Sequence, residues 1–568
     1  MIDASHESTG DWLDETLRIW FEVAPVDATF VGQHEHDSAL PDPSPAGLKA
    51  TRNRLAARLE VRPDPAPSDP LLALDEALMT DALHVRLWEH DSKWMSGNPS
   101  VHTGEAAFGL MSLLLPHHAG TESDRLDALS ARLRGLPNFF QGAVASVSRA
   151  PTAWTERALR ECRGLRAFLT RGLAYTAVDD PEGVEVAYDA VSSFERFLSV
   201  QLARHPSEEV GCGEEGLELL VRRGHRLDRS PGEIAEYARE ELDRTVDWAR
   251  RNAPEVGLHG HRDPGPSLRA LHPSPAGYYA AYATVWREMR ALSDTRKLLT
   301  WPDFPIRYEP RPDWARAAAR DLYFLFYRSP ATYARPAVHT YMVSPLPEHD
   351  DVDIEAFLSA NNDSVIKLNH VVHHGGIGHH VQNWHAFRSP LRVGRIAAVD
   401  CASRIALFSG GTMAEGWACY ATDLIAEAGG LTELEQFAEH AGRVRMCARA
   451  IVDVGLHLGE MDLAQAAAFY REHAGMPASA AHSEAVKNSM FPGAALMYLV
   501  GSDLIHQLRA DIMGIQGDAF DLCTFHDALL SWGSIPVPVI AEEMKRRATM
   551  RLPMGAHDPV PLSSKEEV

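Results

Sequence analysis

Residues 230–253, SPGEIAEYAREELDRTVDWARRNA, combine several signals of an amphipathic helix and set the expectation for the whole fold. Ser230 can cap the helix, Pro231 suits its first turn, and apolar residues then recur at spacings of three and four. Three further segments repeat this pattern: 52–61, 124–136 and 431–458. The chain is therefore expected to be mainly α-helical.

Strand-like stretches are few. FPIRYEP at 304–310 and VHTYMVSPL at 338–346 are rich in β-branched and aromatic residues, which favour strands. Segments rich in proline or glycine interrupt the helical pattern at 62–70, at 257–277 and from Pro553 onward. We therefore expect only two strands, both in the middle of the chain.

The length of the chain indicates more than one hydrophobic core. At 568 residues it exceeds the usual size of a single core, so we expect two helical lobes joined by a connecting region. The expected divisions are an N-terminal lobe at 1–255, a linker with connecting helices at 256–335, a second lobe at 336–552 and a tail at 553–568.

Charge and composition exclude several classes of partner. The formal net charge is −23 and the pI is about 5.6, so nucleic acid and anionic lipid would be repelled. The six cysteines lack the spacing of a disulfide framework, the N-terminus lacks the pattern of a secretory signal, and no apolar run is long enough to span a membrane. We expect a cytoplasmic protein with a small-molecule substrate, while its oligomeric state stays open.

Six histidines lie within residues 369–385, NHVVHHGGIGHHVQNWH, and such a density of polar, titratable rings has no packing rationale. On an ideal helix His380 returns to the face of His373, whereas His379 points elsewhere. The glycines between them can bend the helix so that a distant pair converges. The segment permits a two-histidine metal clamp and leaves open whether His379 or His380 completes it.

A third metal ligand is available in the next helical segment. GGTMAEGWACYATDLIAEAGG, at 410–430, places Glu415 just inside a predicted helix, and a carboxylate from a following helix is a common third zinc ligand. An acidic residue near a helix N-terminus is also a favourable partner of the helix dipole, and a histidine-rich segment can be a solvated loop. Both readings stay open on the residues alone.

Several motifs together resemble one family. HHGGIGHHVQ at 373–382 is similar to H-E-x-x-P-G-H-H-x-Q, and EGWACYA at 415–421 matches E-G-W-A-x-Y-A. These motifs are typical of the bacterial domain-of-unknown-function family 885, whose members resemble zinc-dependent peptidases. Four further segments resemble signatures of this family, in the same order: 28–48, 449–457, 491–501 and 525–540. The resemblance implies a large, two-lobed, zincin-like helical fold with a few short strands near the active site.

The resemblance also implies a metal site. His373 and His379 fall on the two metal-binding histidines of the family, and Glu415 falls on the third ligand. The implied cofactor is a divalent metal, most simply Zn²⁺, with Fe²⁺ as the alternative. His370 and His380 are candidates for extra ligands.

The departures from the family pattern fall where the chemistry would take place. The glutamate that serves peptidases as general base is replaced by His374, and the Arg-Tyr pair that could grip a carboxylate is replaced by Lys487 and Asn488. An imidazole at this position can act as a base or bind the metal. Ordinary peptide hydrolysis is therefore expected to be absent or very weak.

Three functions follow, from different classes. The first is a metal-dependent enzyme with a diverged reaction, a hydrolase or a lyase or dehydratase, acting on a small amide or carbonyl compound. The second is a non-haem iron enzyme, and the third is an inactive relic that serves as a binding protein. In the first, His374 transfers protons, Lys487 holds an anionic substrate, Tyr498 replaces the missing oxyanion donor and His457 supports the site.

Overall fold

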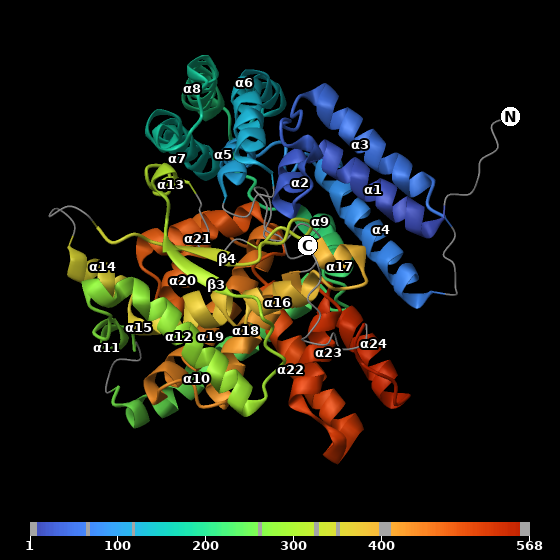
Figure 1. Ribbon diagram of the computed structural model, residues 1–568, viewed down its shortest axis with the longest axis vertical. Helices are drawn as coiled ribbons and strands as arrows, with labels where there is room; N and C mark the ends of the chain where they lie inside the picture. Colours follow the sequence, from blue (N-terminus) through green and yellow to red (C-terminus); the bar gives the residue numbers. More distant parts are fainter. Residues whose placement is uncertain are drawn as a thin grey trace.

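A computed structural model of the chain describes residues 8–63, 69–115, 120–258, 264–322, 329–347, 353–396 and 411–556. The protein is mainly α-helical, as predicted (Figure 1). The helices of the first half are α1 (Thr9–Val23), α2 (Pro25–Val31), α3 (Pro45–Glu60), α4 (Pro70–Asp91), α5 (Pro99–Met111), α6 (Glu122–Ser146), α7 (Thr152–Ala167), α8 (Pro181–Arg196), α9 (Gly213–Leu219), α10 (Pro231–Asn252), α11 (Gly265–Arg269) and α12 (Tyr278–Arg296).

The second half begins with short elements and ends with long helices. Its helices are α13 (Asp313–Arg316), α14 (Ile354–Ala360), α15 (Asp363–Val365), α16 (His379–Ala386), α17 (Arg392–Ile396), α18 (Gly411–Glu427), α19 (Glu433–His457), α20 (Leu463–Ala474), α21 (Ala478–Met490), α22 (Met497–Gln516), α23 (Leu522–Ser531) and α24 (Val537–Thr549). Wider π-helical segments are η3 (Phe168–Gly172), η5 (Phe197–Gln201), η7 (Leu220–Gly224) and η10 (Ile366–Gly375).

The helix predicted at 230–253 forms as α10. Ser230 caps α10, and Glu233 returns a hydrogen bond to the backbone of Ser230, which completes a capping box. The three other predicted segments lie in α3, α6 and α19. These four predictions are confirmed. All four helices have a side-chain cap at the N-terminus, and in α6, α10 and α19 this cap is a full capping box.

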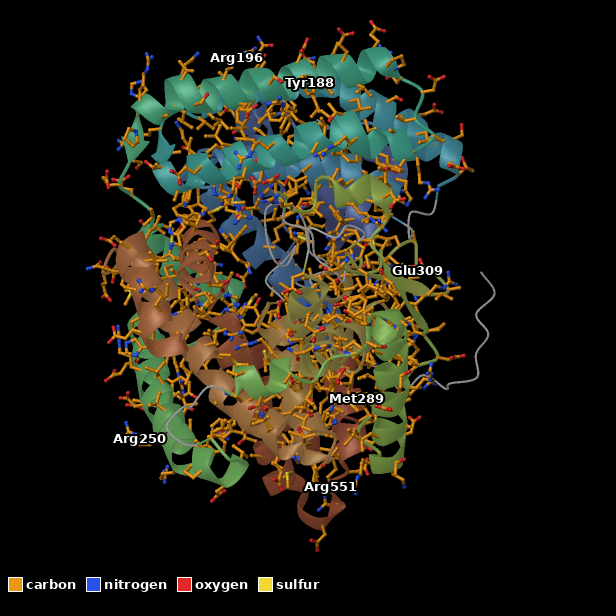
Figure 2. The ribbon with its side chains drawn as sticks, turned by 90° about the vertical axis from the view of Figure 1, so that its left-hand side faces the viewer. Tyr188, Arg196, Arg250, Met289, Glu309 and Arg551 are labelled. Carbon is orange, nitrogen blue, oxygen red and sulfur yellow. The ribbon has the colours of Figure 1, made fainter. Side chains whose placement is uncertain are left out.

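The helices gather at two ends of the molecule (Figure 1). Helices α1 to α8 lie at one end, and α18, α19, α22 and α24 lie at the other. Figure 2 shows Tyr188 and Arg196 of α8 at the opposite end from Arg250 of α10. Helix α10 lies within the range 1–255 that was expected to form the N-terminal lobe, yet its buried face packs on α19. The packing therefore groups α10 with the C-terminal helices.

The two predicted strands are confirmed. β3 (Ile306–Pro310) pairs in parallel with β4 (His339–Val343), and a second pair of two-residue strands, β1 (Ala150–Pro151) and β2 (Pro206–Ser207), was not predicted. β4 is buried along its whole length. The Tyr341 hydroxyl on β4 donates to His370 Nδ1 at 2.7 Å, so this strand pair packs directly beneath the histidine-rich segment.

Large aromatic side chains fill the interior, and Trp12, Trp20, Trp417 and Trp532 are all fully buried. Among the described residues, every helix is too short or too polar to cross a membrane.

Candidate metal centre

The histidine-rich segment folds as two helices joined by a sharp bend. The π-helix η10 ends at Gly375, and α16 begins at His379. A β-carbon on Gly378 would overlap the carbonyl oxygen of His373, and one on Gly375 would overlap the hydroxyl of Tyr308. The bend therefore requires glycine at these positions, and it brings His373 and His379 together although they are six residues apart.

Helix α18 brings Glu415 to the same place. The indole nitrogen of Trp417 donates to the carbonyl oxygen of Ile377 in the bend, at 2.9 Å. On the opposite side, a β-carbon on Gly416 would lie 2.5 Å from the backbone of Gly501 in α22, so α18 and α22 are in close backbone contact. These two contacts fix the position of Glu415 relative to the histidines.

Three donor atoms converge at this point. Glu415 Oε2 lies 3.4 Å from His373 Nε2 and 3.6 Å from His379 Nε2. The three side chains have exposed fractions of 18%, 13% and 12% for His373, His379 and Glu415, so solvent still reaches them. Between His379 and His380, the structure brings His379 to the cluster.

The arrangement fits a divalent metal. Glu415 Oε2 is buried and has no hydrogen-bond partner among the described residues. His379 Nδ1 lies 3.2 Å from Gln382 Oε1. Because an amide oxygen can only accept a hydrogen bond, Nδ1 carries the proton, and the Nε2 lone pair is left directed at Glu415. Bonds of ~2.0–2.2 Å at a tetrahedral metal separate two ligand atoms by about 3.4 Å. The observed separations match this value.

His374 borders the same site. Its Nδ1 donates to the carbonyl oxygen of Asn369 at 2.7 Å, so Nε2 carries the lone pair. Its ring centroid is 4.6 Å from that of His373 and 5.5 Å from that of His379, and one nitrogen of each ring lies within 4.8 Å of the others. The residue that the family resemblance places at the position of the peptidase glutamate is thus beside the cluster.

The protonation states suit metal binding. Burial lowers the pKa of His373 and lowers that of His374 well below its ordinary value, so both rings are neutral near pH 7. Burial acts to raise the pKa of Glu415, but His373 and His379 together outweigh it and hold this pKa well below its ordinary value. Neutral imidazoles and carboxylates are donors that Zn²⁺ commonly binds.

The two candidates for extra ligands lie outside the cluster. His370 is buried against Tyr282 and accepts from Tyr341. His380 stacks on Phe304, with ring centroids 4.5 Å apart, and donates to its carbonyl oxygen at 2.8 Å. His370 thus contacts β4 and His380 contacts the residue two positions before β3, and both lie outside the group of His373, His374 and His379.

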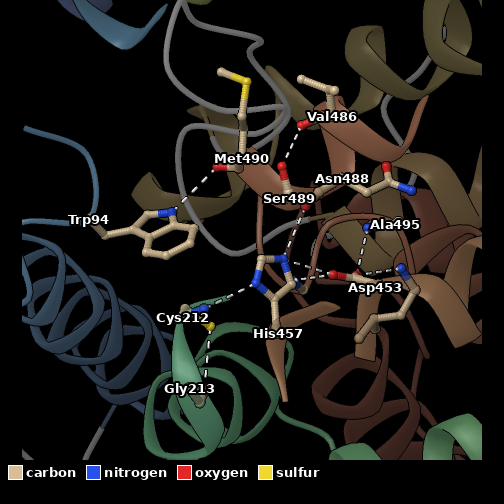
Figure 3. Close-up of polar contacts among 12 residues, drawn as sticks. Trp94, Cys212, Gly213, Asp453, His457, Val486, Asn488, Ser489, Met490 and Ala495 are labelled. Atoms are coloured by element: carbon tan, nitrogen blue, oxygen red, sulfur yellow. Dashed lines mark hydrogen bonds and ion pairs between the residues drawn. The ribbon is translucent and has the colours of Figure 1, made fainter. Parts of the chain in front are cut away.

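His457 is part of a buried backbone network (Figure 3). Its Nδ1 accepts from the backbone N–H of Cys212, and its Nε2 donates to the carbonyl oxygen of Asn488 at 3.0 Å. Asp453, one turn earlier, accepts from three backbone N–H groups of the segment after α21, namely those of Gly493, Ala495 and Leu496. This network holds α19 against that segment, and it engages both nitrogens of His457.

Lys487 lies on the side of the site formed by α21. Burial lowers the pKa of its ammonium group, and Glu415 is among the carboxylates that oppose this effect. Tyr498 lies under the guanidinium of Arg449, with 4.9 Å from Arg449 Cζ to the ring centroid. Lys487 and Glu415 are thus close enough to interact electrostatically.

An ion pair that was not predicted from the sequence lies beside the candidate metal centre. Arg449 Nε lies 2.7 Å from Glu484 Oε1, and the charge of Arg449 reaches His373, where it contributes to the lowered pKa. Two signals pointed to this pair: Arg449 begins the signature segment 449–457, and Glu484 precedes Lys487 by three residues, which places both on one face of α21.

A separate cavity of about 1350 Å³ lies between α10, α18, α19 and α22. Cys419, one helical turn after Glu415, contributes to its wall together with Glu439 and Trp248. Cys419 thus connects the wall of this cavity to the helix that carries Glu415.

Sequence comparison assigns the chain to a family. Residues 25–544 match the family described as "Bacterial protein of unknown function (DUF885)". The chain belongs to this family. No match was found among curated proteins.

Two solved structures share the fold of this DUF885 member. One is "a putative lipoprotein of unknown function" from Shewanella oneidensis, with 21% identity, a TM-score of 0.73, and coverage of 94% of this chain and 99% of that one. The other is "the putative lipoprotein" from Colwellia psychrerythraea, with 18% identity, a TM-score of 0.74, and coverage of 94% and 97%. At these identities the likeness concerns the fold alone.

Proposed function

We propose that this protein is a metal-dependent enzyme, with Zn²⁺ as its metal, on a two-lobed, zincin-like scaffold whose reaction has diverged from peptide hydrolysis. The observation that carries the proposal is the convergence of two imidazole nitrogens on the orphaned Glu415 Oε2, at 3.4 and 3.6 Å. A buried carboxylate oxygen without a partner is costly, and a bound cation would remove that cost. His373, His379 and Glu415 would hold the metal.

The proposed reaction is a hydrolysis or an elimination on a small amide or carbonyl compound. When bound, the metal would supply Lewis acidity toward a carbonyl oxygen or a water. His374 offers a neutral imidazole whose Nε2 lone pair can accept a proton beside it. Lys487, near the carboxylate of Glu415, offers a cation for an anionic substrate. These roles replace those of the glutamate and the Arg-Tyr pair in peptidases.

A dipeptide and carboxypeptide hydrolysis assay tests whether the reaction has diverged. The purified protein should cleave ordinary peptides very slowly, and His374→Glu should not restore cleavage. A general base contributes ~10²–10⁴-fold and oxyanion donors ~10²–10³-fold, so the glutamate alone recovers only part of the lost rate. Rapid cleavage that a chelator abolishes would refute the divergence.

Elemental analysis of the purified protein separates the proposed enzyme from its alternatives. We expect about one zinc per chain. Iron in place of zinc would favour non-haem iron chemistry, because two histidines and one carboxylate are also the ligand set of such enzymes. A protein that binds neither metal, even after reconstitution, would support the third alternative, an inactive relic that serves as a binding protein.

We also propose a cytoplasmic location. The five cysteines that the structure describes, all except Cys401, are free thiols, which agrees with a reducing compartment. Cell fractionation tests this proposal, and recovery of the protein in a membrane or extracellular fraction would overturn it.

A further inference from the structure

Gln382 on α16 joins the candidate metal centre to the turn between α23 and α24. Its carboxamide oxygen Oε1 lies 3.2 Å from His379 Nδ1, and its Nε2 donates to Ser534 Oγ at 3.4 Å. Gln382 is 1% exposed and Ser534 is fully buried, so both hydrogen bonds lie away from bulk water, where they are stronger. Because Ser534 engages the amide nitrogen, the amide oxygen is the atom that faces His379.

The turn that carries Ser534 is itself held in place by backbone contacts. The N–H of Ser534 donates to the carbonyl oxygen of Gly394 in α17 at 2.9 Å, and Ser389 Oγ donates to the carbonyl oxygen of Trp532 at 3.0 Å. Gly533 has a φ of 76°, and a β-carbon there would lie 2.6 Å from the oxygen of Gly394, so the turn and α17 are in close backbone contact. These contacts fix the position of the Ser534 hydroxyl.

A neutral His379 ring has a single N–H, and an acceptor lies on each side of the ring. Gln382 Oε1 faces Nδ1 at 3.2 Å, whereas Glu415 Oε2 faces Nε2 at 3.6 Å. With its proton on Nε2, the ring would donate to Glu415, and Nε2 would have no lone pair for a metal. With its proton on Nδ1, the ring donates to Gln382, and Nε2 keeps its lone pair. The hydrogen bond to Gln382 therefore selects between a closed site and one that is open to a metal.

We propose that Gln382, held by Ser534, is the positioning residue that keeps His379 in the tautomer able to bind the metal. The inference deepens the proposed function, on which it rests for the metal itself. Gln382 touches neither the metal nor the substrate in this account and acts through His379 alone. Its amide carries no charge, so it selects the tautomer without adding to the negative charge of Glu415.

Two substitutions of similar length separate the acceptor atom from the shape of the side chain. Gln382→Glu keeps an oxygen beside His379 Nδ1, whereas Gln382→Met fills a similar space without an acceptor. Competition with a chromophoric chelator should give a Zn²⁺ affinity about 10- to 100-fold weaker in Gln382→Met and a retained affinity in Gln382→Glu.

The control Ser389→Ala removes another buried hydrogen bond to the same turn, away from His379, and should keep the affinity of the unmodified protein. Unchanged affinity in Gln382→Met would overturn the inference. Equal losses in Gln382→Met and Gln382→Glu, or a comparable loss in Ser389→Ala, would reduce Gln382 to a packing role and overturn it as well.

The tautomer itself can be measured in metal-free protein, so this second test does not depend on the metal. Ring nitrogen chemical shifts of isotopically labelled histidine distinguish N–H at Nδ1 from N–H at Nε2, and the His379 signal is identified by its absence in His379→Gln. The proton should lie on Nδ1 in the unmodified protein and in Gln382→Glu, and on Nε2 in Gln382→Met.

A proton on Nε2 in the unmodified protein, or one that stays on Nδ1 in Gln382→Met, would overturn the inference. A proton that moves from Nδ1 to Nε2 in Gln382→Met, in a protein that binds no zinc, would uphold the control of the tautomer by Gln382 and count against the proposed function.

Discussion

At the scale of single residues, His374 decides how far the proposed reaction departs from that of a peptidase. It stands where the family motif has glutamate, and it keeps its lone pair on Nε2 because Nδ1 donates to Asn369. Burial keeps the ring neutral, which makes it available as a proton acceptor but lowers its basicity. Glu415 Oε2 lies within 3.4 and 3.6 Å of His373 and His379, and His374 belongs with these two histidines to a group whose ring nitrogens lie within 4.8 Å of one another, so His374 can serve as a base or as a ligand.

The role of His374 can be tested without knowing the substrate. His374→Ala should weaken Zn²⁺ affinity by no more than about 10- to 100-fold, the range typical of residues outside the ligand set. The measurement is competition with a chromophoric chelator at pH 7. A loss as large as that caused by His373→Ala would make His374 a ligand and leave the proton-transfer role without a residue.

At the scale of elements, the glycine bend between η10 and α16 assembles the site. Glycine at Gly376 and Gly378 lets the backbone turn where a β-carbon would meet the carbonyl oxygens of Val371 and His373. The sequence predicted a glycine-dependent convergence but could not choose between His379 and His380. That choice depends on Phe304, which stacks on His380 and binds its Nε2, a contact between residues 76 positions apart.

Gly378→Ala should disrupt the bend. The new methyl group would overlap the backbone oxygen of His373, so we expect a loss of a few kcal/mol in stability, on the order of other backbone-strain substitutions, together with loss of metal binding. Differential scanning calorimetry and metal analysis check this.

Gly442→Ala in α19 is the matched control. A β-carbon there meets nothing within 4 Å, and alanine is the better helix former by about 0.5–1 kcal/mol. This variant should be slightly more stable and keep its metal. If both variants behaved alike, the proposed role of the bend would be wrong.

Local sequence signals predicted the helices and strands better than they predicted the contacts of the candidate site. Helix α10 was predictable from its cap and periodicity, and β3 and β4 from their β-branched and aromatic residues. The buried network of His457, by contrast, depends on Cys212 and Asn488, which come from distant parts of the chain.

At the scale of the whole molecule, buried neutral histidines make stability depend on pH. Burial lowers the pKa of His102, His457 and His526 to about 4 in each case, against 6.5 in an unfolded chain. Between pH 6.5 and 4 the unfolded state therefore binds more protons than the folded state. Stability falls as the pH falls through this window, by up to about 1.4 kcal/mol per pH unit for each histidine.

Thermal unfolding recorded from pH 7.5 to 4.5 checks this expectation. The melting temperature should be nearly constant above about pH 7 and fall below pH 6.5, although burial raises the pKa of Asp453 and Glu439 to about 7 and these two carboxyls oppose part of the decline. His102→Gln, which removes one of the three groups, should have a shallower decline, although its absolute stability will differ. A melting temperature that stayed constant down to pH 4.5 would contradict the proposed burial of neutral histidines.

The central claim is that His373, His379 and Glu415 bind one divalent metal, and metal content in single-alanine variants tests it most directly. We would measure zinc by mass spectrometry in the unmodified protein, in His373→Ala, His379→Ala and Glu415→Ala, and in the control His482→Ala, whose histidine is exposed on α21. The account predicts about one zinc per chain in the unmodified protein and the control, and severe loss in each of the other three. Full stoichiometric zinc in all three variants would contradict it.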